Sequence, residues 1–319
     1  MKKTILTFLI SYISIISFSQ DGLPYYNTYL LGDEYLLHPS MAGRSVCGDL
    51  SFSTRQQWFG TDDHPATYVV SFNKRIGERR GIGAYIMRDE NGPTKQTEMQ
   101  ITYNHHLVFD GDEVKSPHRL QMALSAQAIL FNYGDLTSLV DQNTDPILSN
   151  TSHSNFNANM SFTYLRGRFR GSLTANSLLD LSSSDAEELG EPINQRNFIA
   201  TAEYKLKPSD AISISPTATY IFEEDQRRDM VDIGAKFSYG INPETRLWAR
   251  ASYRAYNDDG FSSLAFTPVV GLDKESWKIS YSYDVDLGEY GSYYRGGHQL
   301  RLGIKLFCQS VCRCDYDEW

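Results

Sequence analysis

The sequence of 319 residues predicts an all-β fold, a transmembrane outer-membrane β-barrel of about fourteen antiparallel strands with an N-terminal periplasmic or plug segment. Three observations predict it. Apolar and polar residues alternate in run after run, the connections between runs are alternately short and long, and the chain starts with a secretory signal. The run Val231–Tyr239, VDIGAKFSY, alternates most clearly. Because successive strand residues point to opposite faces, each run has one apolar and one polar face.

The alternating runs give the strands of the barrel. In an outer-membrane barrel the apolar face meets lipid, and closure pairs every backbone group without leaving an edge in hydrocarbon. The predicted strands are 47–57, 66–75, 81–88, 95–107, 119–130, 155–165, 168–177, 198–207, 211–222, 231–240, 245–255, 262–271, 276–286 and 298–307.

The polar faces of these strands carry charges of both signs into the lumen. Such charges could pair across the lumen, hold a plug, or flank water in a pore, and the sequence leaves all three open. The residues concerned are Arg55, Asp232, Lys236, Arg250, Arg254, Lys278, Asp284, Arg301 and Lys305.

Short and long connections fall on opposite rims of the predicted barrel. Every second connection tends to be short, with 109–117 as the exception, whereas the longest, 131–154, 178–197 and 287–297, all fall in the other set. Outer-membrane barrels have short turns on the periplasmic side and long loops outside. A soluble β-sandwich has no reason to sort its loops in this way. An even strand number also returns both chain ends to the periplasmic rim.

Residues 1–19 are predicted to be a cleaved signal peptide. Lys2 and Lys3 precede an apolar stretch over 5–16, and Ser19 ends a small-residue cleavage site. The stretch is too short for a membrane anchor, the alternative interpretation. We therefore expect export to the bacterial outer membrane, with lipid around the strands.

Composition agrees with this location. Aromatic residues make up 13% of the chain, with 21 tyrosines, which suits the aromatic girdles of a barrel at the membrane interfaces. The formal net charge of −9 argues against nucleic acid as a partner.

The segment before the first strand does not alternate. Residues 20–46 are rich in tyrosine and leucine, too apolar to leave in water, and are expected to pack in or against the periplasmic mouth. A disordered leader is the alternative interpretation. The barrel then covers 47–307, and a cysteine-containing tail covers 308–319.

Short motifs in the first 110 residues resemble the PorP/SprF outer membrane proteins of the type IX secretion system of Bacteroidota. The stretches YYNTYLL, LLHPSMAGR, RQQW and HPATYVVSF carry the resemblance, although His38 stands where the family usually has Asn. The matching positions are Tyr25, Tyr26, Pro39, Ala42, Gly43, Arg55, Gln57, Trp58 and Pro65.

The resemblance implies a binding role. Members of the family are regarded as membrane partners of secreted surface proteins, often large adhesins, in gliding bacteria. They aid export of the cargo and are thought to anchor it at the cell surface. The long loops would then face the exported domain, and the periplasmic rim would be free to contact secretion or motility components. A porin-like diffusion or uptake channel is the alternative that the barrel equally permits.

No motif for catalysis, cofactor or metal stands out. His105 and His106 are adjacent, so on a strand they face opposite sides and cannot share one metal ion. No local Ser–His or Asp–His arrangement is singled out either. We expect a protein that is not an enzyme and that has no cofactor and no metal site.

The four cysteines gather at the predicted seam. Cys47 opens the first strand, and Cys308, Cys312 and Cys314 follow the last. In a closed even-stranded barrel these places are neighbours, and the periplasm is oxidising. We expect a disulfide between Cys47 and one of the other three, whose remaining two could pair with each other. Zinc is the less favoured alternative, because of the compartment and the short C-x-C spacing.

Overall fold

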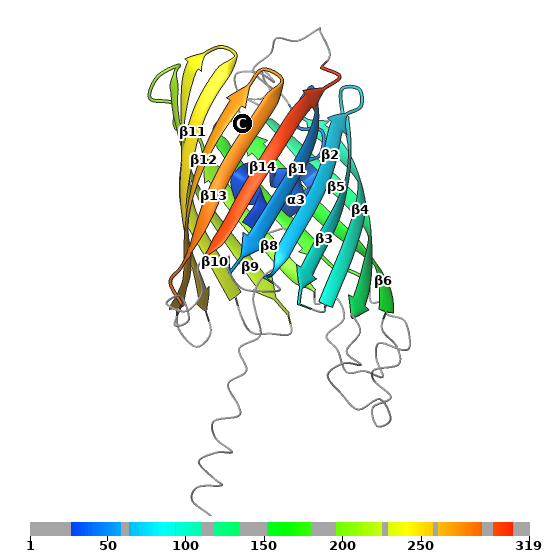
Figure 1. The fold of residues 1–319 in the computed structure, drawn as a ribbon. Coiled ribbons are helices and arrows are strands. Elements are labelled where there is room, and N and C mark those ends of the chain that lie inside the picture. Colours follow the sequence, from blue (N-terminus) through cyan, green and yellow to red (C-terminus); the bar gives the residue numbers. More distant parts are fainter. Residues whose placement is uncertain are drawn as a thin grey trace, which may run out of the picture.

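The computed structural model is a closed barrel in which fourteen antiparallel strands pair in chain order and β14 pairs with β1 (Figure 1). It describes residues 27–58, 64–92, 94–109, 118–133, 152–179, 196–224, 229–257, 261–288 and 296–308. The strands are β1 Gly48–Gln57, β2 Ala66–Arg75, β3 Arg80–Asn91, β4 Thr94–Val108, β5 His118–Tyr133, β6 Ser152–Arg166, β7 Phe169–Asn176, β8 Asn197–Tyr204, β9 Ile212–Glu223, β10 Asp229–Asn242, β11 Thr245–Asn257, β12 Phe261–Lys274, β13 Trp277–Asp286 and β14 Gly297–Leu306.

The predicted fold class is confirmed, and all fourteen predicted strands are present. No predicted end differs from the observed end by more than about three residues, the error expected of boundaries read from a pattern. Some strands are shorter than predicted, such as β8, which ends at Tyr204 and not at 207. Others are longer, because backbone pairing continues after the alternation has stopped. For example, β5 continues to Tyr133 and β6 begins at Ser152, and the two strands pair along this added length.

Alternation decides which side chains face lipid. In β10, Ile233 is 58% exposed on the outer wall, whereas the neighbouring Asp232 is 1% exposed and faces the lumen. Since the outer wall meets hydrocarbon and not water, these exposed apolar side chains are what insertion requires. No helix among the described residues is long and apolar enough to cross a membrane.

The two rims differ as predicted. One, here called the short-turn rim, holds the start of β1, the end of β14 and brief turns such as 167–168 and 243–244. The other, the long-loop rim, holds the connections 134–151 and 177–196, although β3 and β4 are joined there by only 92–93. By the rule for outer-membrane barrels, the short-turn rim faces the periplasm.

The predicted seam disulfide is present, between Cys47 and Cys308. It lies immediately beyond the first pair of the β1–β14 ladder, Gly48 with Leu306. Cys312 and Cys314 lie outside the described residues, as do the predicted signal peptide and most of the tail.

Candidate functional site: a filled lumen and a pocket at its mouth

Residues 27–44 lie in the lumen of the barrel (Figure 1), and most of their side chains are buried there. This lumen segment folds as three short helical turns, η1 Tyr29–Leu31, α3 Glu34–Leu37 and η2 Pro39–Met41. Gly32 ends η1 in the left-handed conformation, with a φ of 93°, and the fixed φ of Pro39 starts η2. Turns this short are not stable alone, so the segment depends on the barrel wall for its shape.

The lumen segment passes from one rim to the other. Asn27 lines a pocket with Tyr256 and Gly297, which lie at the long-loop ends of β11 and β14. At the other end, Gly43 lies against Gly81, next to the turn between β2 and β3. The sequence predicts a segment in or against the periplasmic mouth, whereas its described part extends through the whole lumen. Tyr25 and Tyr26 lie outside the described residues.

Leucines of the segment form the centre of the buried core. Leu30, Leu31 and Leu37 are each no more than 1% exposed. Burial of such a side chain contributes about 2 kcal/mol. They belong to one cluster with apolar strand residues that face the lumen, Val69, Met87, Ile199, Ile221 and Val269. In a water-filled barrel, residues that face the lumen would be polar. The inner wall is therefore apolar at the positions where the leucines of the segment pack against it.

Polar contacts fix the first half of the segment. The Tyr29 hydroxyl donates to Asp232 Oδ1 at 3.2 Å and accepts from Arg250 Nη2 at 2.7 Å. Ser51 and Ser71 both donate to Asp33 Oδ2, each at 2.6 Å. These partners come from β1, β2, β10 and β11, so the segment ties strands from both ends of the chain.

Buried charges pair with one another and with the segment. Glu34 forms ion pairs with Arg44 at 2.8 Å and with Arg170, which also pairs with Glu203. Arg301 lies 3.8 Å from Asp33 of the segment. Other lumen charges pair strand to strand: Arg55 with Asp284, Arg250 and Arg254 with Asp232, and Lys278 and Arg301 with Asp49. Of the three uses that the sequence leaves open, the structure shows holding of a plug, through the pairs of Arg170 and Arg301 with the segment. The pairs between strands join adjacent or next-but-one strands along the wall and do not cross the lumen.

The second half of the segment is held by hydroxyl groups of the wall. The two ring nitrogens of His38 lie 2.8 Å from the hydroxyls of Thr174 and Thr201. Ser40 lies between Ser161, at 2.8 Å, and Thr163, at 2.7 Å. Every one of these groups is buried, so each would lose a partner if the segment left.

We predict that His38→Ala lowers the free energy of unfolding by about 2–3 kcal/mol, because two buried threonine hydroxyls lose a partner. His38→Asn, the residue usual in the resembling family, is expected to cost about 1 kcal/mol, since its shorter side chain reaches one threonine. Urea unfolding in lipid vesicles measures both. The control is His105→Ala, where the ring lies 3.5 Å from the Tyr103 hydroxyl. Equal stability of His38→Ala and the unaltered chain would contradict the assignment.

Two glycines of β3 allow the segment to approach the wall. A Cβ on Gly81 would lie 2.2 Å from the carbonyl oxygen of Ala42, and one on Gly83 would lie 2.5 Å from the ring of Tyr35. From the sequence these glycines indicate only a small-residue strand. Their spacing of two, which places both on the lumen face, is the signal that could have identified them.

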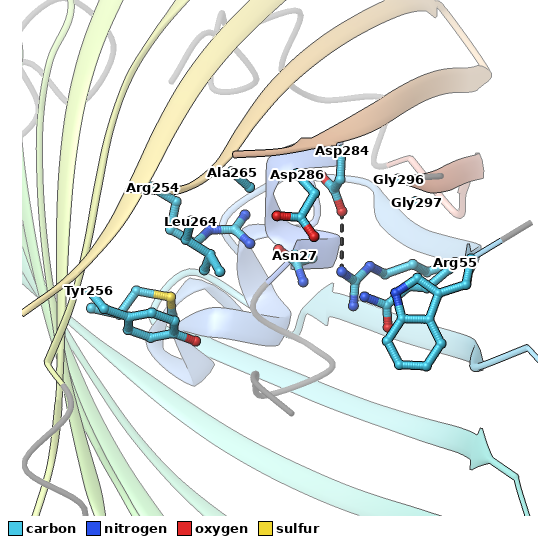
Figure 2. Close-up of a pocket in the computed structure, with 13 residues that line it drawn as sticks. Asn27, Arg55, Arg254, Tyr256, Leu264, Ala265, Asp284, Asp286, Gly296 and Gly297 are labelled. Carbon is cyan, nitrogen blue, oxygen red and sulfur yellow. Dashed lines mark hydrogen bonds and ion pairs between the residues drawn. The ribbon is translucent and has the colours of Figure 1, made fainter. Parts of the chain in front are cut away.

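A pocket of about 90 Å³ opens at the long-loop rim, beside the start of the segment (Figure 2). Asn27 contributes to it from the segment, and Arg55, Gln57 and Trp58 contribute from the end of β1. The rest of the lining comes from β10 to β14 and the residue before β14. Trp58 has a φ of 53°, which costs a non-glycine residue about 1–2 kcal/mol. Strain of this kind is often kept at functional positions.

The motif residues thus gather at two places. Pro39, Ala42 and Gly43 lie in the lumen segment, where Asn104 Nδ2 donates to the Ala42 carbonyl at 2.8 Å and Asn73 accepts from the Gly43 amide at 3.2 Å. Arg55, Gln57 and Trp58 line the mouth pocket. Pro65, just before β2, accepts a backbone hydrogen bond from Gln57 at 2.9 Å.

Solved structures similar to this chain are outer-membrane barrels. The toluene transporter TbuX of Ralstonia pickettii has a TM-score of 0.49 and 10% identity, over 86% of this chain and 93% of that one. The toluene transporter TodX of Pseudomonas putida has a TM-score of 0.45 and 10% identity, over 88% and 92%. Likeness of this degree carries no argument about what the chain binds. No curated protein matches the chain.

A protein-family model gives the specific match. The family described as type IX secretion system membrane protein PorP/SprF matches residues 18–304, which include the lumen segment and almost the whole barrel. The match therefore extends well beyond the motifs of the first 110 residues. The chain belongs to the PorP/SprF family of type IX secretion system membrane proteins.

Proposed function

We propose that this barrel is the outer-membrane partner of a protein secreted by the type IX system, and that it aids export of that protein, its anchoring at the cell surface, or both. It acts by binding, and neither as an enzyme nor as a channel. The observation that carries the proposal is the filled lumen. A barrel whose interior is occupied by its own chain has only its rims and outer wall to offer a partner.

The porin-like alternative requires a water path through the barrel. Leu30, Leu31 and Leu37 occupy the middle of the lumen against apolar wall residues, and around them the segment is tied by buried hydrogen bonds. Opening a path would expose this apolar surface to water and leave buried polar groups without partners. The interior of this chain supports a closed barrel.

The long-loop rim is the face that an exported partner would meet. The connections between β5 and β6 and between β7 and β8 are its longest, and in outer-membrane barrels long loops lie outside the cell. The short-turn rim would remain available to periplasmic secretion or motility components.

Replacement of a long loop by a short linker tests the proposal. We expect a large secreted protein to co-purify with the barrel from native membranes, and to be lost when residues 181–194 are replaced by a short Gly-Ser linker. The control makes the same replacement at 111–116, in a connection of the opposite rim. Recovery of the secreted protein that is unaffected by either replacement, or no such protein at all, would refute the proposed role.

We predict that the purified barrel shows no steady conductance in planar bilayers. The physical reason is that an ion would have to pass the apolar cluster that buried leucines of the lumen segment form with the wall. Single-channel recording at low and high voltage measures this. A stable open-channel current from the unaltered chain would favour the channel.

A further inference from the structure

A groove of about 530 Å³ crosses the lipid-facing wall from β6 to β10. Its floor follows one row of paired, outward-facing residues: Tyr164 with Gly171, Gly171 with Ala202, Ala202 with Ala218, and Ala218 with Ile233. The three middle residues carry a methyl group at most, whereas Tyr164 and Ile233 have large side chains. The wall is therefore hollowed over β7, β8 and β9, with a raised side chain at each end of the row.

The groove suits a hydrocarbon chain. Phe162, Leu173 and Tyr220 line it beside the small residues and are 37%, 60% and 41% exposed on the lipid-facing wall. Its volume lies within the range of about 300–1,000 Å³ that is usual for small-molecule pockets. A lipid chain elsewhere around the barrel touches the wall along one side, whereas a chain in the groove also touches both flanks. Because dispersion contacts add up, the chain in the groove is bound more tightly than its neighbours.

Unpaired cations lie at one end of the groove. Arg166 follows Tyr164 by two positions on β6, so it lies on the same outer face and nearer the short-turn rim. Arg168 lies in the turn to β7, and both arginines are exposed. Neither forms an ion pair within the part of the chain that the structure describes. The Tyr164 hydroxyl lies 3.1 Å from His118 Nε2, which places two further polar groups at this level.

Acidic groups among the described residues do not cancel this positive charge. The next turn on the short-turn rim, between β8 and β9, carries Asp210 together with Lys205 and Lys207. At the opposite end of the groove, the Tyr220 hydroxyl donates to the carboxylate of Asp229. An anionic group attached to the hydrocarbon chain would therefore lie at the short-turn end, which is the periplasmic side of the membrane.

We propose that this groove binds one phospholipid of the periplasmic leaflet. One acyl chain lies over Gly171, Ala202 and Ala218, and the phosphate accepts hydrogen bonds from Arg166 and Arg168. Guanidinium groups match the geometry of phosphate oxygens, and such charge-assisted hydrogen bonds are stronger than neutral ones. The inference is independent of the proposed function, because the groove lies on the lipid-facing wall and not on the long-loop rim.

Native mass spectrometry of the full-length barrel, released from detergent micelles, tests the proposal. The probe is dioleoyl-phosphatidylethanolamine, and dioleoylglycerol is its match without a phosphate. We expect one molecule of the probe to stay bound after the detergent is removed, and the diacylglycerol to be retained about tenfold less. Ala202→Leu with Ala218→Leu fills the row and should reduce retention of the probe about tenfold or more. Arg166→Gln with Arg168→Gln should lower it to the level of the diacylglycerol.

Two control variants match these changes. Ala249→Leu adds the same side chain to the lipid-facing wall of β11, and Arg79→Gln removes an exposed arginine from the β2–β3 turn of the same rim. Both should retain the probe as the unaltered barrel does. Retention that the two leucines leave unchanged, or equal retention of both lipids, would overturn the site. A dimer that the two leucines abolish would assign the groove to a second copy of the chain and also overturn it.

Discussion

A barrel that carries both Gly81→Ala and Gly83→Ala is expected to conduct ions where the unaltered chain is silent. Each new Cβ would have to occupy space held by the lumen segment, 2.2 Å from the carbonyl oxygen of Ala42 and 2.5 Å from the ring of Tyr35. Real Cβ contacts are essentially never below 3.0 Å. Over-packing of this kind costs about 1–3 kcal/mol at each site, so the segment must shift or leave.

The contacts that would break explain the size of the effect. The Tyr35 hydroxyl lies 3.0 Å from that of Thr102, and the Tyr35 ring packs edge-on against Tyr85. The Ala42 backbone accepts from Asn104. A shift of the segment by even one atomic diameter would undo all three contacts.

Planar-bilayer recording and urea unfolding together measure the result. The matched control is Gly171→Ala, also a strand glycine, where the added Cβ meets only the Phe169 side chain, at 3.3 Å. We expect the control to be silent and nearly as stable as the unaltered barrel. If the double variant remained silent and equally stable, the segment would not be held against β3 as described.

Loss of the seam disulfide is expected to reduce stability by up to about 5.5 kcal/mol, the chain-entropy value for a loop of this length. The bond joins residues separated by 261 positions, so its removal frees almost the entire chain in the unfolded state. It also lies where the lumen segment leads into β1, so we expect the β1–β14 ladder to fray first at Gly48 and Leu306.

Serine substitutions distinguish the stability contributed by the disulfide bond from that contributed by packing of the two cysteine side chains. Cys47→Ser, Cys308→Ser and the double variant should lose the same amount of stability, since each removes the same bond. The unaltered barrel in reductant should match them in a gel assay of the temperature at which the folded band disappears. Cys312→Ser with Cys314→Ser is the control. Additive losses for Cys47→Ser and Cys308→Ser would show that packing of each residue, and not the bond, stabilises the seam.

The parts of the fold that the sequence predicts are those that depend on local pattern along the chain. The strands of the barrel, the sorting of loops and the seam disulfide all depend on alternation with a period of two and on an even strand number. Both can be counted along the chain, and both are confirmed. They require no knowledge of which residues meet across the lumen.

The path of the lumen segment could not be predicted in this way. It has no period, and its partners are far away in sequence, as with Tyr29 and Asp232, 203 residues apart. One signal was nevertheless present. Adjacent apolar pairs such as Val69–Val70, Phe198–Ile199 and Val269–Val270 break the alternation, and in each the inward member packs in the cluster around the segment. Consecutive apolar residues in a barrel strand thus indicate an occupied lumen.

The position of the lumen segment also constrains the order in which the molecule can be assembled. In the segment, η1 contacts β12, β13 and β14, the last strands to be synthesised, whereas η2 contacts β4, β5 and β6. The ring of strands closes only when β14 meets β1, and the segment is already enclosed in the finished ring. The barrel is therefore expected to close around the lumen segment, with the seam pairing as the last step, so that residues 27–44 serve as the template for the wall that encloses them.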